Sequence, residues 1–242
     1  MAVAMLSLEI GDRILYKDTA MGIASAQLND RWYVESITYQ AGVNRITGIE
    51  VSLVPSYAYR DLAHIAYDLF TRPNTATLLG QALSGQTWSG DSNFRILSNR
   101  ARPISTAEQI PTLALGAADC VVEADILGIT GAGTEVVGLV YRHADASNYW
   151  RAVLSTVAGA ILALQKVVVG TPTTVGSVAF TPAASHELRV MVQGTRHRVW
   201  LDRKLMIDAT DAALQSNTRV GLYSTGAGAT SDDFDDIAAQ GL

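Results

Sequence analysis

Side chains of different character alternate along much of this chain, which is the period of a β-strand. The pattern is clear in residues 32–40, where every second residue would lie on the same face of a sheet. Similar segments recur, separated by turns rich in glycine or asparagine. The predicted strands are residues 13–17, 32–40, 46–54, 94–97, 119–129, 135–143, 149–155, 160–169, 186–193, 197–201, 205–209, 220–224 and 234–239. We therefore expect an all-β fold.

Short turns between these segments predict hairpins. Residues 193–196 read QGTR, and Gly194 can adopt the positive φ that a two-residue turn needs. Residues 202–204 read DRK and join the next two predicted strands. Near the start of the chain, residues 41–44 (AGVN) supply a turn, and Pro55 ends the strand that follows because proline has no N–H to donate.

The strands fall into two groups, which predict two domains. Residues 1–60 form a small N-terminal β module, residues 61–66 a connector, and residues 67–242 a larger domain. Many antiparallel strands in one domain imply a two-sheet sandwich or jelly roll. A β module of roughly fifty-five residues has a marginal core of its own. We therefore expect the first module to dock on a partner, on another copy of the chain, or on the second domain.

The amino-acid composition limits the classes of partner that we expect. The net charge of -5 and the sequence pI near 5.3 provide no basic surface for nucleic acid. Cys120 is the only cysteine and lies in an apolar run, so we expect a small buried side chain. No run reaches the roughly 20 apolar residues of a membrane helix, and no membrane insertion is expected. The first residues lack a basic segment and reach Glu9 early, so we expect no export signal of ordinary form.

Several short motifs follow one another in an order that resembles a known family. Asp68, Phe70 and Arg72 are followed by a Gly-x-x-Trp at Trp88, and Asp-Asp-Ile follows near the end of the chain at residues 235–237. With the segments CVVEADI and GLVYRHADASNYWRAVL between them, residues 67–239 resemble the concanavalin A-like (laminin-G-like) jelly rolls of bacterial extracellular proteins and phage tail proteins.

The first module indicates the biological context of the chain. LEIGDRILYKD, RWYVESITYQ and ITGIEVSLVPS are similar to the last β module of tail-tip or minor tail proteins of long-tailed phages. Together the two resemblances imply a virion component of a phage tail, extracellular after host lysis, with other tail proteins as partners. They supply no ligand, because jelly rolls of this kind serve as sugar binders, hydrolases and inert spacers.

The segment GLVYRHADASNYWRAVL carries the candidate ligand site. Alternation places Tyr149 and Arg151 on one face of a strand and Trp150 on the other. An aromatic ring beside directed polar groups suits a sugar, because the ring can stack on a pyranose while the polar groups bind hydroxyls. The candidate ligand-binding residues are Arg142, Asp145, Asn148, Tyr149 and Arg151. The alternative is that the hairpin only stabilises the sheet through cross-strand pairs.

Acidic residues near the closing strand suggest a second site. Ca²⁺ takes six to eight oxygen ligands, and pairing of the first and last strands of the jelly roll would bring Asp68 to this run. The hypothetical ligands of a structural calcium ion are Asp68, Asp232, Asp233, Asp235 and Asp236. The alternative is a solvated acidic edge that discourages association between sheets.

The sequence gives little evidence that the protein is an enzyme. Some relatives of the resembled fold cut β-glucans with a Glu-x-Asp-x-x-Glu strand, but here Glu123 and Asp125 are followed by Gly128. No Gly-x-Ser-x-Gly elbow and no zinc-binding histidine spacing occurs. We therefore expect a non-catalytic, structural and adhesive tail protein that binds a host-surface glycan. The alternatives are a purely structural decoration domain and a polysaccharide depolymerase.

Overall fold

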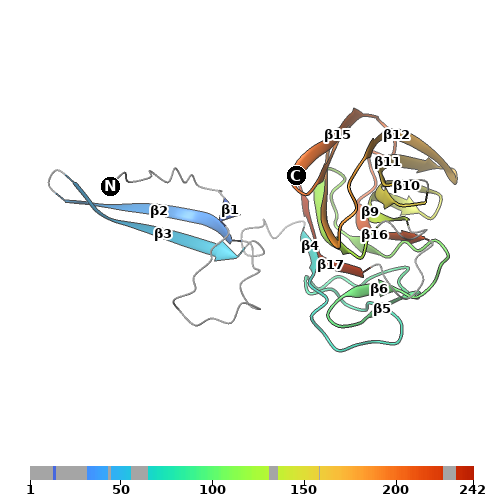
Figure 1. The fold of residues 1–242 in the computed structure, drawn as a ribbon, viewed down its shortest axis with the longest axis horizontal. Helices are drawn as coiled ribbons and strands as arrows, with labels where there is room; N and C mark the ends of the chain where they lie inside the picture. Colours follow the sequence, from blue (N-terminus) through green and yellow to red (C-terminus); the bar gives the residue numbers. More distant parts are fainter. Residues whose placement is uncertain are drawn as a thin grey trace. The chain divides into compact units, whose positions relative to one another are not determined.

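The computed structural model describes residues 13–14, 32–42, 45–55, 65–130, 136–157, 159–225 and 233–242. The chain divides into two compact units, Met1–Asp61 and Leu62–Leu242. The first holds one antiparallel sheet of order β1-β2-β3, made of β1 (Arg13–Ile14), β2 (Trp32–Gly42) and β3 (Arg45–Pro55) (Figure 1). Pro55 is the last residue of β3 and lies opposite Trp32.

The second unit contains two antiparallel sheets (Figure 1). The six-stranded sheet has the order β12-β11-β10-β9-β16-β7. Its strands are β7 (Thr112–Ala114), β9 (Val136–Asp145), β10 (Asn148–Ser155), β11 (Ile161–Val168), β12 (Thr171–Ala179) and β16 (Arg219–Thr225).

The eight-stranded sheet has the order β15-β14-β13-β8-β17-β6-β5, and β4 also pairs with β17. Its strands are β4 (Ile65–Asp68), β5 (Phe94–Ile96), β6 (Ala101–Pro103), β8 (Cys120–Leu127), β13 (Ser185–Gln193), β14 (Arg196–Leu201), β15 (Lys204–Thr210) and β17 (Asp233–Gly241). The pairing of β4 with β17 closes the unit by joining its first and last strands, as predicted, and places Asp68 opposite Ile237.

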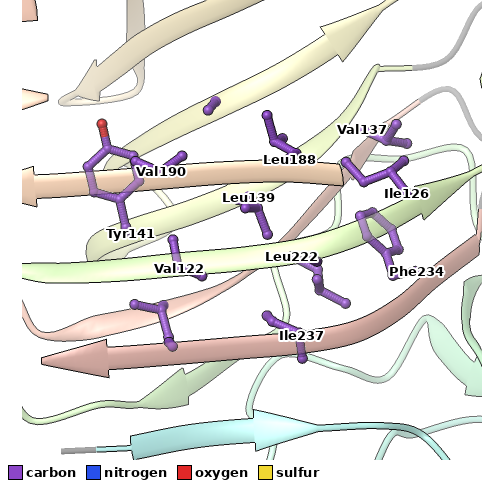
Figure 2. Close-up of a cluster of buried hydrophobic side chains, with 14 of the residues drawn as sticks. Val122, Ile126, Val137, Leu139, Tyr141, Leu188, Val190, Leu222, Phe234 and Ile237 are labelled. Atoms are coloured by element: carbon purple, nitrogen blue, oxygen red, sulfur yellow. The ribbon is translucent and has the colours of Figure 1, made fainter. Parts of the chain in front are cut away.

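The core lies between the two sheets. Strand β8 alternates buried and partly exposed residues along its whole length, and its inward side chains meet those of β9 and β16 from the other sheet. Figure 2 shows Val122 and Ile126 of one sheet in the same cluster as Leu139 and Leu222 of the other. Cys120 is buried in this core, and burial raises the pKa of its thiol to about 12. The predicted all-β sandwich is therefore confirmed.

The sequence pattern found most of the strands and missed β4, β6, β7 and β12. Strands β6 and β7 have three residues each, too few to show a period of two. Strand β12 is exposed or only partly buried at every position, so its two faces carry no contrast. Strand β4 begins at Ile65, inside the segment expected to be a connector. No helix long and apolar enough to cross a membrane occurs in the part of the chain that the structure describes.

The two hairpin turns predicted in the second unit are confirmed. Gln193 lies opposite Arg196, with Gly194 at a φ of 55°. Leu201 lies opposite Lys204, and the two residues between them both have positive φ, as a two-residue turn of type I′ requires.

The Asp-x-Phe-x-Arg motif at the start of the second unit is a buried polar network. The fully buried carboxylate of Asp68 accepts two hydrogen bonds from the Arg72 guanidinium, at 2.6 and 2.8 Å, and one from Trp88 Nε1 at 2.7 Å. Arg72 also donates to the carbonyl oxygen of Leu79. The motif therefore holds the long segment between β4 and β5 against the sheet.

Candidate functional site

The outer face of the six-stranded sheet carries a second cluster of side chains, separate from the core. Trp150 points into the core, whereas Tyr149 and Arg151 point to this outer face, as the alternation predicted. Tyr149 lies opposite Val167 of β11, and Arg151 lies opposite Gln165. The buried members of the outer cluster are Val140, Tyr149, Val153, Ala163, Val167 and Tyr223.

Glu108 lies at the centre of the polar part of this face. Its Oε1 accepts hydrogen bonds from the hydroxyls of Tyr149 at 2.7 Å and Tyr223 at 2.8 Å, and from Arg151 Nη1 at 3.3 Å. The side chain of Glu108 is nevertheless 46% exposed. The three bonds to one oxygen thus fix a carboxylate whose other side faces solvent. We call Glu108, Tyr149, Arg151, Gln165 and Tyr223 the Glu108 cluster.

The backbone around Glu108 is held by the neighbouring strand. Gln109 exchanges two backbone hydrogen bonds with Ser224 of β16, at 2.8 and 3.1 Å, which extends the pairing of β7 with β16. The position of Glu108 is therefore set by the sheet and not by a free loop.

Arg151 is held from both sides. Its Nε donates to Gln165 Oε1 at 2.8 Å, and Gln165 in turn donates to Thr174 Oγ1. Its guanidinium carbon lies 4.4 Å from the centre of the Tyr223 ring, within the range of a cation–π contact. Only 12% of the Arg151 side chain is exposed, so little rotamer entropy is left to lose when it binds a ligand.

Burial changes the pKa of the two tyrosine hydroxyls in the cluster. It raises the pKa of Tyr149 and of Tyr223 well above the ordinary value, and the hydrogen bond to Glu108 raises both further. Both hydroxyls therefore stay protonated at neutral pH and act as donors to Glu108. Tyr149 is 1% exposed and Tyr223 3%, so neither ring offers an open face on which a sugar could stack.

Two hollows flank Glu108. The first has a volume of about 330 Å³ and is lined by Arg151, Tyr149 and Tyr223, with Gly170 from the turn between β11 and β12 and Pro172 from β12. The second has a volume of about 480 Å³. Glu108 and Ala146 line both, and each volume falls in the range of ligand-binding clefts.

The remaining predicted ligand residues of the hairpin lie elsewhere or have another role. Arg142 has a φ of 46° at an irregularity in the pairing of β9 with β16, which turns its side chain inward. Its guanidinium is fully buried and donates to Asp119 at 2.7 Å and to the carbonyl oxygens of Ala118 and Gly194. Arg142 therefore lies away from the Glu108 cluster and joins the ends of the two sheets instead.

Asp145 and Asn148 stabilise the turn between β9 and β10. The Asp145 carboxylate accepts hydrogen bonds from the Ser147 backbone N–H at 2.7 Å and from Asn148 Nδ2. These bonds, above all the one from Ser147, lower the pKa of Asp145. Asn148 Oδ1 accepts from the Val169 backbone N–H, which joins this turn to the one between β11 and β12. Both residues thus hold the turns that carry Ala146 and Gly170, which line the first hollow.

Two of the predicted calcium ligands, Asp68 and Asp233, are buried, and both bind arginines. Asp68 binds Arg72, and Asp233 accepts from Arg102 at 2.5 and 2.6 Å. Asp235 points to the outer face of the eight-stranded sheet beside Asp125, and burial raises its pKa. Asp236 is exposed at a bulge, and Asp232 lies outside the described residues. Among the described residues, no three His, Cys, Asp or Glu side chains are grouped so as to hold a metal ion.

Glu123 and Asp125 belong to the other sheet. Their neighbours Val122 and Ala124 are buried in the core, so both carboxylates lie on the outer face of the eight-stranded sheet. Glu123 is 4.0 Å from Arg189. The incomplete glucanase-like pattern is therefore on a different sheet from the Glu108 cluster.

The sequence pattern did not predict Glu108, Gln165 or Tyr223 as site residues. Tyr223 could have been predicted from the strand pattern, because it is adjacent to Leu222. Leu222 points into the core, so Tyr223 points to the outer face. Gln165 follows from the pairing of β10 with β11 once Arg151 is placed. Glu108 had no signal, since it lies in an irregular segment between β6 and β7.

Comparisons with known proteins identify the fold. No protein-family model matches the sequence, and no curated protein matches it. Among solved structures, the GH43 protein BlXynB from Bacillus licheniformis matches with a TM-score of 0.56 at 14% identity, over 88% of this chain and 51% of that one, so the chain spans about half its length. The potassium-bound carbohydrate recognition domain of Emp46p matches with a TM-score of 0.54 at 11% identity, over 76% of this chain and 99% of that one.

A third match is the carbohydrate-binding module CBM66 from Bacillus subtilis, with a TM-score of 0.48 at 19% identity, over 69% of this chain and 94% of that one. At such identities the likeness to BlXynB and Emp46p concerns the fold alone. The second unit is accordingly a two-sheet antiparallel sandwich of the jelly-roll class.

Proposed function

We propose that the second unit binds carbohydrate through the outer face of its six-stranded sheet and catalyses no reaction. The observation that carries this proposal is Glu108, a half-exposed carboxylate fixed by Tyr149, Tyr223 and Arg151 between two hollows. A fixed carboxylate can accept hydrogen bonds from two neighbouring sugar hydroxyls, and a fixed guanidinium can donate to others. The similar Emp46p domain is a carbohydrate recognition domain by name, which is in keeping with this function.

The setting is a proposal from the sequence. The resemblance of residues 1–60 to a phage tail β module, and of residues 67–239 to tail-associated jelly rolls, supports a virion tail component that is extracellular after host lysis. In this role the first module attaches to other tail proteins or to further copies of the chain, and the second presents the Glu108 cluster to a glycan on the host surface. Immunogold labelling of purified particles with an antibody against the second unit tests the placement, and unlabelled tails would contradict it.

A glycan array tests the binding function. The wild-type protein is expected to bind at least one bacterial surface polysaccharide, and Glu108→Ala to weaken that binding by roughly 10- to 100-fold, because a hydrogen bond to a charged group contributes about 1.5–3 kcal/mol. Tyr223→Phe, which removes one donor to Glu108, should weaken it less. Arg196→Gln is the control, because Arg196 pairs with Asp208 on the other sheet.

Two results would contradict the proposal. Unchanged affinity in Glu108→Ala would mean that the hairpin only stabilises the sheet, and the absence of any bound glycan would favour a purely structural decoration domain. Release of reducing sugar from the bound polysaccharide by the purified protein would instead favour a depolymerase.

A further inference from the structure

The second hollow contains an arginine that is not paired with Glu108. It is lined by Arg219 at the start of β16, by His143 near the end of β9, and by Glu108, Gln109 and Thr112. Arg219 and His143 lie directly opposite each other in the pairing of the two strands. The His143 ring lies 5.9 Å from the ring of Tyr149, which joins the two hollows across one face.

Arg219 is oriented by its neighbours, and none of the described carboxylates is paired with it. Its Nε donates to Thr112 Oγ1 at 3.0 Å and its Nη2 to the Thr112 carbonyl oxygen at 3.3 Å. A guanidinium has five N–H donors, so these two bonds leave three, including both on Nη1. No carboxylate among the described residues lies within salt-bridge distance of Arg219, whereas Arg151 is paired with Glu108.

Among the described residues that line the two hollows, two arginines face one carboxylate, which leaves one positive charge in excess. Arg151 offsets the charge of Glu108 in the first hollow, and Arg219 is left in the second. Burial, and secondarily the proximity of Arg219, lowers the pKa of His143, so this imidazole is neutral at pH 7 and adds no second positive charge to the hollow. The Thr112 that orients Arg219 is itself buried and fixed by backbone hydrogen bonds to Ser89.

We propose that the second hollow is a subsite for an acidic sugar residue, whose carboxylate pairs with the free edge of the Arg219 guanidinium while a neighbouring sugar occupies the first hollow. The planar fork of a guanidinium matches a carboxylate in a bidentate pair. The ligand class is thus a polysaccharide that contains uronic or similar carboxylated residues. This inference rests on the proposed carbohydrate-binding function and adds the chemical class of its ligand.

Matched pairs of polysaccharides test the subsite in the full-length protein. The probes are polygalacturonate, alginate, hyaluronan and acidic bacterial capsule, each beside its carboxyl-reduced counterpart, with dissociation constants measured by calorimetry. The wild-type protein should bind at least one acidic member about tenfold or more tightly than its reduced form. Arg219→Gln should lose that preference, because it should weaken binding of the acidic form more than binding of the reduced form, and Arg219→Lys should keep part of it. Arg196→Gln on the other sheet is the charge-matched control.

The outcomes separate the two proposals. Equal binding of acidic and reduced partners by the wild-type protein overturns the acidic subsite and leaves carbohydrate binding standing. A preference that persists in Arg219→Gln, or an equal loss of both partners, also overturns the subsite, because another group would then be responsible. Failure of the wild-type protein to bind any probe while it binds a neutral glycan on the array overturns the subsite alone. Binding of no glycan at all overturns both.

Discussion

Replacing Asp68 by asparagine tests whether the Asp-x-Phe-x-Arg motif is structural. The carboxylate is fully buried and accepts bonds from Arg72, Trp88 Nε1 and the Phe70 backbone N–H. The asparagine amide would keep the volume but leave the Arg72 guanidinium without its counter-charge. Breaking a buried ion pair on one side costs about 3–5 kcal/mol. Since the Arg72 side chain is 20% exposed, we expect the lower end, about 3 kcal/mol.

Urea denaturation followed by tryptophan fluorescence measures this effect, because Trp88 is itself a partner of Asp68. With a slope of about 2 kcal/mol per M, a loss of about 3 kcal/mol lowers the midpoint by roughly 1.5 M. Asp208→Asn is the matched control, since it breaks the exposed pair with Arg196 and should move the midpoint little. Equal small shifts in the two variants would refute the assignment of a structural role to the motif.

Three further predictions concern stability. Burial lowers the pKa of both His143 and His197 in the folded protein, so the unfolded chain binds more protons than the folded protein below about pH 6.5. The free energy of unfolding should therefore fall as the pH drops from about 7 towards 5. A free energy of unfolding that does not change over this range would contradict the prediction. Gly138→Ala should prevent stable folding, because its Cβ would lie 2.8 Å from a backbone carbon of β10; a normal circular dichroism spectrum and melting temperature would argue against that contact. Because Asp68 and Asp233 already bind arginines, a calcium chelator should leave the unfolding midpoint unchanged, whereas a lower midpoint would support the calcium hypothesis.

The sequence by itself determined the features that depend on neighbours in the chain. Alternation located the long strands, and it assigned Trp150 to one face and Tyr149 and Arg151 to the other. Glycine and polar residues at the turns located the hairpins. These features follow from the period of two of a strand and from the φ values that a tight turn requires, and both are local properties.

The tertiary structure alone decided which residues meet at the site. Glu108 joins Tyr149 across 41 residues of sequence and Tyr223 across 115. One irregularity in strand pairing turned Arg142 from a candidate ligand residue into a buried link between the sheets, and cross-strand register placed Arg219 beside His143. Register and bulges arise from packing between distant segments, so no local pattern in this chain encodes them.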